Sequence, residues 1–226
     1  MRSLVLGQPR DARDGGGAPR MTSDRWPISN MSEEPKHHGL LIVLVGPSGV
    51  GKSTISRRLA EKMNVWYTVS ATTRPKKPGD DEGKIYDHID RKEFFRRLDS
   101  DQFLEYAQVY GDYYATPKHP ALDHMAAGKD VLLEIDVQGA LQVRHHYPDA
   151  LLIFILPPDE PTLLQRLQAR ARDSADDIHK RFMAAKREIH MAKGSRAFDT
   201  MVVNDELDRA VEEISKIIKH KRAGGI

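Results

Sequence analysis

The chain has 226 residues, of which 39% are hydrophobic and 30% charged, and its formal net charge is only +2. This composition is typical of a globular protein and gives no bulk electrostatic reason to expect a nucleic-acid partner. The chain has no cysteine, which excludes disulfide bonds and Cys-ligated metal sites and is compatible with a reducing cytosol. No segment approaches the roughly 18 apolar residues of a membrane helix, so we expect no membrane partner.

The N-terminal part differs in kind from the rest. Residues 7–20, GQPRDARDGGGAPR, are rich in Gly, Pro and Arg without periodicity, which is typical of disorder. Met1, Met21 and Met31 are three candidate starts. We therefore expect a disordered extension over 1–38, explained more simply by an over-long gene start than by a regulatory tail, and one folded domain over 39–222.

The first predicted elements are a strand and a helix with a glycine loop between them. The apolar run GLLIVLV, 39–45, ends at Gly46 and indicates a buried parallel strand. From Lys52 onward, Ile55, Leu59 and Met63 recur at helical spacing. Strand, loop and helix in this order are the context that a phosphate-binding loop requires.

The loop itself, GPSGVGKST at 46–54, fits the pattern G-x-x-x-x-G-K-[ST]. Glycines let backbone N–H groups turn inward around a phosphate, Lys52 can reach the outer phosphates, and Ser53 can offer its hydroxyl to Mg²⁺. The residues expected to bind the nucleotide are Gly46, Pro47, Ser48, Gly49, Val50, Gly51, Lys52, Ser53 and Thr54. The loop alone does not separate ATP from GTP, or a kinase from a hydrolase.

Residues 66–118 are polar and rich in turns. The stretch RPKKPGDDEG contains several helix and strand breakers, Asp90 with Glu93 suggests a capping box that opens a short helix, and 103–110 is typical of a strand followed by a turn. Because this block interrupts the alternation of strand and helix, we predict an inserted small α+β lobe.

Alternation then resumes to the end of the chain. Further strands are predicted at 131–136, 151–156 and 200–204. Helices are predicted at 118–127, about 160–170, around the stripe from Ile178 to Ile189, and at 205–222. Strands separated by helices predict an α/β fold whose parallel sheet is covered by helices on both faces.

The inserted block also carries candidate anion ligands. Arg74, Lys76 and Lys77 lie in one loop, and Tyr86 and Tyr114 follow. Arginine presents a planar fork that suits bidentate phosphate contacts, and tyrosine hydroxyls can complete the shell. Taken alone, however, such a basic loop is better explained as solvated surface.

Several stretches in order now resemble one family. They are GPSGVGKST, TVSATTRPKKPG, EFF, FLEYAQVYGDYYATP, GKDVLLEIDVQGA, FILPP and VVND. From about Gly39 to Lys219 the chain resembles guanylate kinases, a family of P-loop nucleoside monophosphate kinases. The resemblance implies a cytoplasmic enzyme that transfers the γ-phosphoryl group of ATP to GMP, and to dGMP, with Mg²⁺ as cofactor, and so recycles GMP. It also implies a core of 39–66, 119–156 and 197–222, a GMP-binding lobe over 67–118 and a lid over 160–195.

The resemblance assigns roles to individual residues. It implies that Arg74, Lys77, Tyr86 and Tyr114 hold the GMP phosphate and that Ser70, Glu105, Thr116 and Asp136 read the guanine. Lys52, Arg74, Arg170 and Arg181 would act in the transfer, and Asn204 would lie near the adenine of ATP. Asp136 could instead serve Mg²⁺, a role for which Glu134 is a second candidate.

The chain departs from the family pattern at four places: Lys77 replaces an arginine, Ala115 replaces a glycine, a phenylalanine that is usual near His88 is absent, and Ala171 follows Arg170 where glycine is common. A ribose bisphosphate kinase is one competitor, but it should lack the pair formed by Glu105 and Thr116. A non-catalytic guanylate-kinase-like module is another, but its phosphate loop is usually eroded. The sequence leaves the oligomeric state open, a homo-oligomer included.

Overall fold

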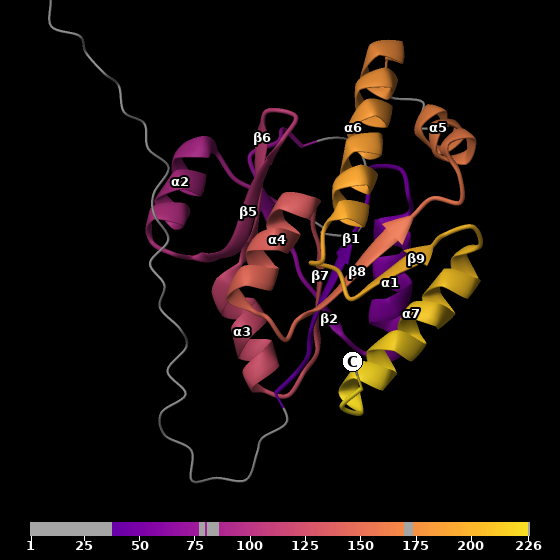
Figure 1. The fold of residues 1–226 in the computed structure, drawn as a ribbon. Coiled ribbons are helices and arrows are strands. Elements are labelled where there is room, and N and C mark those ends of the chain that lie inside the picture. The colour runs from indigo at the N-terminus through magenta and orange to yellow at the C-terminus, as the bar shows by residue number, and fades with distance from the viewer. Residues whose placement is uncertain (1–37, 77–79, 81–85, 170–173, 226) are drawn as a thin grey trace, which may run out of the picture.

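The computed structural model describes residues 38–76, 80, 86–169 and 174–225. They form two β-sheets with helices packed around them (Figure 1). The extension predicted over 1–38 lies outside the described residues, apart from His38.

The larger sheet is wholly parallel. Its strands are β1 (Leu41–Val45), β2 (Trp66–Tyr67), β7 (Val131–Glu134), β8 (Leu151–Leu156) and β9 (Thr200–Val203), in the order β2-β7-β1-β8-β9. The central strand β1 is buried along its whole length, as its unbroken apolar sequence predicts. The parallel sheet expected from the sequence is therefore confirmed, with β2 as an additional edge strand that was not predicted.

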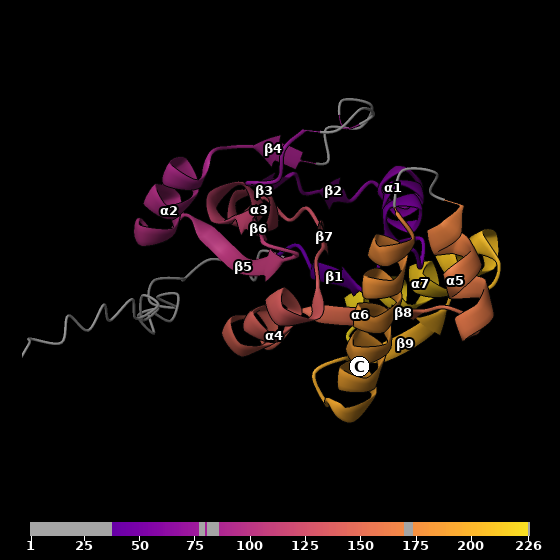
Figure 2. The same cartoon turned by 90° about the horizontal axis from the view of Figure 1, so that it is seen from above.

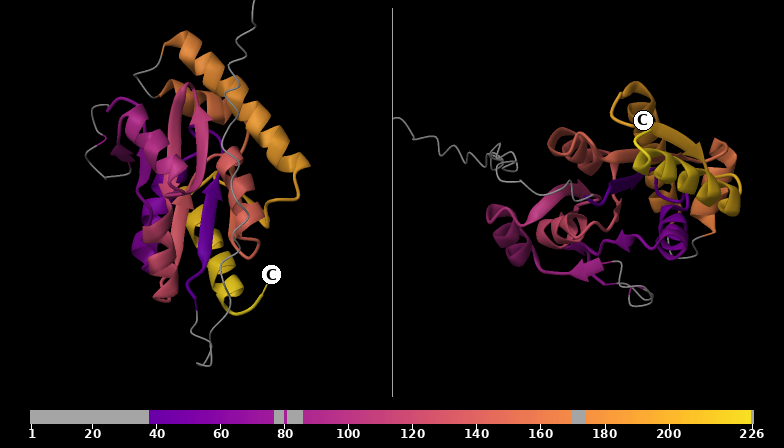
Figure 3. Two further views of the ribbon diagram at one scale, coloured as in Figure 1. Left: turned by 90° about the vertical axis from the view of Figure 1, so that its left-hand side faces the viewer. Right: turned by 90° about the horizontal axis from the view of Figure 1, so that it is seen from below.

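Helices cover both faces of this sheet, which can be followed from above in Figure 2 and from two further sides in Figure 3. On one face, Ile42 and Leu44 pack with residues of α1 (Lys52–Met63) and α7 (Leu207–Arg222). On the other face, Val43 packs with residues of α3 (Lys118–Ala126), α4 (Val137–His146) and α6 (Ala175–Gly194). Because side chains alternate along β1, they pack into two separate hydrophobic layers, one on each face of the sheet.

The smaller sheet is mixed and lies in the block predicted to be inserted. Its strands are β3 (Ser70–Thr72), β4 (Tyr86–His88), β5 (Phe103–Val109) and β6 (Asp112–Pro117), in the order β4-β3-β6-β5. Only β3 and β4 pair in parallel, and β5 and β6 form an antiparallel hairpin. Phe94 of α2 (Arg91–Asp99) fills a small core of this sheet together with Phe103.

The helix α2 begins as predicted, but the capping box is only half formed. Glu93 donates its backbone N–H to Asp90 Oδ1 at 2.8 Å. The Glu93 carboxylate, however, accepts hydrogen bonds from Arg96 and Arg97. In a full capping box this carboxylate would accept from the backbone N–H of the N-cap residue. Here the two nearby guanidinium groups bind it instead.

The sequence analysis missed α4, the short strand β4 and the strand β6, where it expected only a turn after the strand at 103–110. Helix α5 (Glu160–Gln168) was predicted, although the predicted end at Arg170 lies outside the described residues. Within the part of the chain that the structure describes, no helix is both long and apolar enough to cross a membrane.

Candidate active site

The glycine loop joins β1 to α1, as its sequence predicts. Gly51 forms the N-cap of α1 with φ +99°, a conformation that side chains other than glycine rarely adopt. A Cβ at this position would also lie 2.6 Å from Asn204 Nδ2. The Lys52 ammonium donates to the carbonyl oxygens of Gly46 at 2.5 Å and Pro47 at 3.2 Å, so the lysine folds back over its own loop.

Asn204 supports this loop from behind. It follows β9, its side chain is buried, and its Nδ2 donates to the carbonyl oxygen of Val50 at 2.7 Å. The backbone carbonyl oxygen of Asn204 accepts from Arg166 Nη1 at 3.0 Å. The amide group predicted to lie near adenine is therefore engaged with the loop backbone in this structure, and its adenine contact stays a prediction.

A short hydrogen-bond chain begins at the loop serine. Ser53 Oγ donates to Glu134 Oε1 at 2.7 Å, and Tyr67 Oη donates to Glu134 Oε2 at 2.5 Å. Burial raises the pKa of Tyr67, so the phenol keeps its proton and remains a donor. Because the Ser53 hydroxyl donates its hydrogen bond to Glu134, the lone pairs of its oxygen stay available to a cation.

This arrangement fits Mg²⁺. The described residues contain no group of three or more His, Cys, Asp or Glu side chains that could hold a metal ion. Mg²⁺ usually needs only one or two protein oxygens beside substrate phosphates and water, and Ser53 with Glu134 provides such oxygens beside the phosphate loop. Glu134 fits this place better than Asp136, which caps α4 by accepting from Gly139 N at 2.9 Å.

The predicted guanine-reading residues lie on neighbouring elements. Glu105 of β5 and Thr116 of β6 are cross-strand partners, and Thr116 Oγ1 donates to Glu105 Oε1 at 2.7 Å. Glu105 is only 2% exposed, and burial raises its pKa to about 7. Ser70 and Asp136 line the same cleft as Glu105. In this arrangement the Thr116 hydroxyl donates its hydrogen bond to Glu105, and its contact with guanine stays a prediction.

The predicted phosphate clamp is also brought together, except for Lys77, which lies outside the described residues. The Arg74 guanidinium lies 5.5 Å from the centre of the Tyr86 ring, and the Tyr86 and Tyr114 rings are 5.8 Å apart. Arg74 Nη2 donates to both carboxylate oxygens of Asp80, at 3.1 and 3.0 Å. Asp80 was not singled out from the sequence, where it is one of several acids in a turn-rich stretch.

His88, one of the departures from the family pattern, also belongs to this corner. Its Nδ1 lies 2.8 Å from the carbonyl oxygen of Arg74, and its Nε2 lies 3.5 Å from Asp80 Oδ2. The imidazole therefore ties β4 to the loop that carries Arg74.

Helix α6 brings Arg181 to the other side of the cleft. Arg181 Nη1 lies 3.3 Å from Ser48 Oγ, and its guanidinium lies 5.7 Å from the centre of the Tyr110 ring. One residue of α6 thus contacts both the phosphate loop and the turn between β5 and β6. The second predicted lid arginine, Arg170, lies outside the described residues, as does Ala171.

The sequence analysis missed Tyr110 and Glu188. Glu188 lines the cleft two helical turns after Arg181, on the same face of α6. Burial raises the pKa of Glu188 to about 7. The seven-residue spacing from Arg181 was the available sequence signal, but acids are common on helix surfaces.

Together these residues enclose one cleft of about 400 Å³. The phosphate loop and Ser53 form one wall, and Glu105 with the phosphate clamp forms another. Of the predicted set, the lining residues are Gly46, Ser48, Gly49, Gly51, Lys52, Ser53, Thr54, Ser70, Arg74, Tyr86, Glu105, Tyr114, Asp136 and Arg181. The fully buried side chains of Val50 and Thr116 stand behind these walls. The cleft therefore brings the phosphate loop and the residues of the predicted phosphate clamp into one space.

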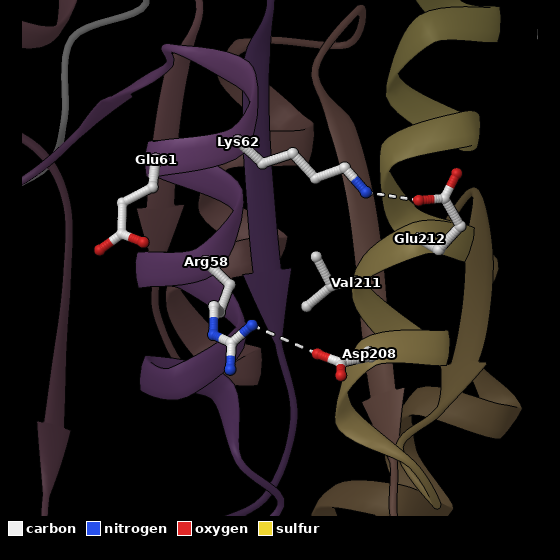
Figure 4. A pocket seen from close by; sticks show the side chains of 6 residues that line it. All are labelled: Arg58, Glu61, Lys62, Asp208, Val211 and Glu212. Carbon is white, nitrogen blue, oxygen red and sulfur yellow. Dashed lines mark hydrogen bonds and ion pairs between the residues drawn. The ribbon is translucent and has the colours of Figure 1, made fainter.

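A second hollow, of about 480 Å³, lies between α1 and α7 (Figure 4). Arg58 pairs with Asp208 and Lys62 with Glu212 across it, and these four side chains are largely exposed. Exposed pairs of this kind typically contribute about 0–1 kcal/mol to stability. These ion pairs link α1 to α7, and the hollow shares no lining residue with the cleft.

Comparison with known proteins gives one consistent family. Residues 38–221 match the family described as guanylate kinase. The chain is 45% identical over 184 residues to the guanylate kinase of Caldanaerobacter subterraneus subsp. tengcongensis, covering 81% of this chain and 88% of that one. It is 44% identical over 194 residues to that of Symbiobacterium thermophilum, covering 85% and 90%.

A solved structure agrees with this assignment. The crystal structure of guanylate kinase from Anaplasma phagocytophilum is similar to this chain with a TM-score of 0.69 and 31% sequence identity, covering 83% of this chain and 88% of that one. The fold, the two-sided cleft and the sequence relatives thus point the same way. The chain belongs to the guanylate kinase family of phosphotransferases.

Proposed function

We propose that this chain, an ATP-dependent kinase of GMP by its family, also accepts dGMP, uses Mg²⁺ and closes an arginine lid over an in-line transfer. The observation that carries the proposal is the cleft, in which the phosphate loop faces Glu105 and the clamp of Arg74, Tyr86 and Tyr114. One wall suits the phosphates of a donor nucleotide, and the other suits a guanine nucleotide as acceptor.

On the donor side, backbone N–H groups of the glycine loop and the N-terminus of α1 would hold the β- and γ-phosphates of ATP. The γ-phosphate would draw Lys52 away from the carbonyl oxygens of Gly46 and Pro47, because a charged acceptor binds the ammonium more strongly. Mg²⁺ at Ser53 and Glu134 would neutralise phosphate charge.

On the acceptor side, recognition depends on the pattern of donors in the base. Guanine presents N1–H and N2–H₂ as neighbouring donors, and the ionised Glu105 carboxylate can accept from both. Adenine lacks this pair, so it would leave the buried carboxylate with Thr116 as a donor but without the two donors of the base. A mismatch of this kind can discriminate between substrates by several orders of magnitude. Nothing in this set of contacts requires the ribose 2′-hydroxyl, which supports dGMP as a second acceptor.

The transfer needs no general base in this proposal. A GMP phosphate oxygen, already ionised at neutral pH, forms the new bond to the γ-phosphorus while the bond to the β–γ bridging oxygen breaks and ADP leaves. Arg74, Tyr86 and Tyr114 would orient the attacking phosphate. Arg181, with Arg170, would neutralise charge on the group in flight and help to exclude water.

An acceptor panel tests the proposal. With ATP and Mg²⁺, we expect rapid phosphorylation of GMP and dGMP and little of AMP or UMP. Phosphorylation of AMP without GMP would refute it, and GMP binding without turnover would favour a non-catalytic module. Lys52→Ala should lower kcat by orders of magnitude while GMP binding, measured by calorimetry, stays nearly unchanged; equal activity would remove the role given to Lys52.

The proposal places the enzyme in the cytoplasm, where both nucleotides are present. The absence of cysteine is compatible with that reducing compartment. Fractionation of cells that produce the full chain would test the location.

A further inference from the structure

Helix α4, which begins directly after Asp136, packs against the strand that carries Glu105. The strand β5 is at the edge of its sheet, so backbone groups on its outer side have no neighbouring strand. At Tyr106 the Gln142 side chain supplies the hydrogen bonds that a neighbouring strand would make. Its Nε2 donates to Tyr106 O at 2.6 Å, and its Oε1 accepts from Tyr106 N at 3.3 Å. Gln142 thus fixes α4 beside the residue that follows Glu105.

Gly139 lies three residues before Gln142, on the same side of α4. A Cβ built on Gly139 would lie 2.1 Å from Glu105 Oε2 and 2.9 Å from Glu105 Cδ. Both distances are too short for a real Cβ atom. The carboxylate can occupy its observed position only because this turn of α4 carries no side chain.

The other carboxylate oxygen cannot yield easily. Glu105 Oε1 accepts the hydrogen bond from Thr116, which is fully buried, and Glu105 itself is only 2% exposed. Protein interiors are closely packed, so the side open to a displaced carboxylate is the cleft that Glu105 lines, which is the space proposed for guanine. Thr116 and Gly139 therefore hold Glu105 from opposite sides.

We propose that Gly139 is a specificity-determining positioning residue, which leaves the space that Glu105 needs in order to accept the two guanine donors. The inference rests on the proposed role of Glu105 as the guanine reader. Gly139 contributes no side chain, and its backbone N–H is engaged with the N-cap residue Asp136. It acts on Glu105 through the space that it leaves for the carboxylate, with Gln142 holding α4 at the required distance from β5.

The first test is Gly139→Ala. We expect KM for GMP to rise at least tenfold, while KM for ATP changes less than twofold because the phosphate loop is untouched. IMP, which lacks the 2-amino group, provides a readout that a general packing defect would not move. The ratio of kcat/KM for GMP to that for IMP should fall severalfold in the variant. An unchanged ratio and an unchanged KM for GMP would overturn the proposal.

Gly194→Ala is the matched control, because no atom lies within 4 Å of a Cβ at that position, at the end of α6. It should leave both Michaelis constants unchanged. If Gly139→Ala does not fold, as judged by circular dichroism, Gln142→Ala tests the same contact between α4 and β5. It should raise KM for GMP but not for ATP, and an unchanged KM for GMP would count against the proposal.

A double-mutant cycle separates this inference from the function on which it rests. Glu105→Ala alone should raise KM for GMP strongly; if it does not, Glu105 is not the guanine reader and the proposed recognition fails. In the Glu105→Ala background, Gly139→Ala should have less than a twofold further effect, because its clash partner is gone. An equal effect in both backgrounds would show that Gly139 acts by another route.

Discussion

The carboxyl group of Glu105 combines deep burial with a role that requires charge. Burial raises its pKa to about 7, so in the free enzyme it becomes protonated as the pH falls below neutrality. A protonated carboxyl group can no longer accept from both guanine donors. We therefore expect the protonation of Glu105, the proposed guanine reader, to determine the pH below which activity falls.

The first prediction concerns this pH dependence. We expect kcat/KM for GMP to fall by up to tenfold per pH unit below about 7, measured at saturating ATP. Because the GMP phosphate also titrates near pH 6, Glu105→Gln is the control: it keeps the substrate titration and loses that of the side chain. Identical pH profiles for the two proteins would show that Glu105 does not titrate in this range.

The second prediction concerns stability. A pKa raised from 4.5 to about 7 means that the folded state holds this proton more tightly than the unfolded state, so stability falls as the pH rises between these values. Above pH 7 the full penalty remains, on the order of 3 kcal/mol. Glu105→Gln should therefore raise the melting temperature at pH 8 and have little effect near pH 4.5. Thermal unfolding at both pH values would check this, and destabilisation at pH 8 would contradict it.

The residues of the site differ in how well the sequence predicts them. The phosphate loop is a local motif, so Lys52 and Ser53 are readable without the fold. Glu105 and Thr116 need the family resemblance, because a strand carboxylate and a hydroxyl are common on surfaces. Tyr67, Asp80, Tyr110 and Glu188 were not predicted. Asp80, Tyr110 and Glu188 line the cleft, and Tyr67 contacts it through Glu134. Apart from the spacing of Glu188 from Arg181, no pattern separates them from an ordinary tyrosine or acid.

Among the elements, α4 shows why sequence patterns alone fall short. Its buried residues Val137, Ala140 and Val143 recur every three positions, and Asp136 provides the N-cap. These signals were present, but Gly139 lies between them, and glycine lowers helix propensity by about 1 kcal/mol. The glycine that weakens the local helix signal is the residue that the neighbouring carboxylate requires. Strand β2 has only two residues, which is too short for any periodicity.

The contact between the end of β9 and the phosphate loop leads to a third prediction. Asn204→Ala would remove the 2.7 Å hydrogen bond to Val50 O and leave that buried carbonyl without its amide donor. We expect the free energy of unfolding to fall by about 1–3 kcal/mol and KM for ATP to rise, with KM for GMP nearly unchanged. Val203→Ala, next to it and 39% exposed, is the control. Equal effects on both Michaelis constants would argue against a role confined to the loop.

At the scale of the whole molecule, the family match begins at residue 38, and the N-terminal extension precedes it. A fourth prediction follows: removing residues 1–30 should change kcat, both Michaelis constants and the melting temperature very little, since no predicted site residue lies there. Steady-state kinetics and calorimetry on the shortened chain would check this. A large loss of activity would assign the extension a function.

The chain leaves the parallel sheet after β2 and returns to it through α3, having built the whole mixed sheet in one uninterrupted stretch. The backbone thus enters the mixed sheet once, before β3, and leaves it once, after β6, at two neighbouring points. The stretch between these two points could be replaced by the corresponding stretch of a kinase that is specific for another base. The phosphate loop would be retained unchanged, whereas Asp136 and Gly139, which lie outside the grafted stretch, would have to be matched to the new base.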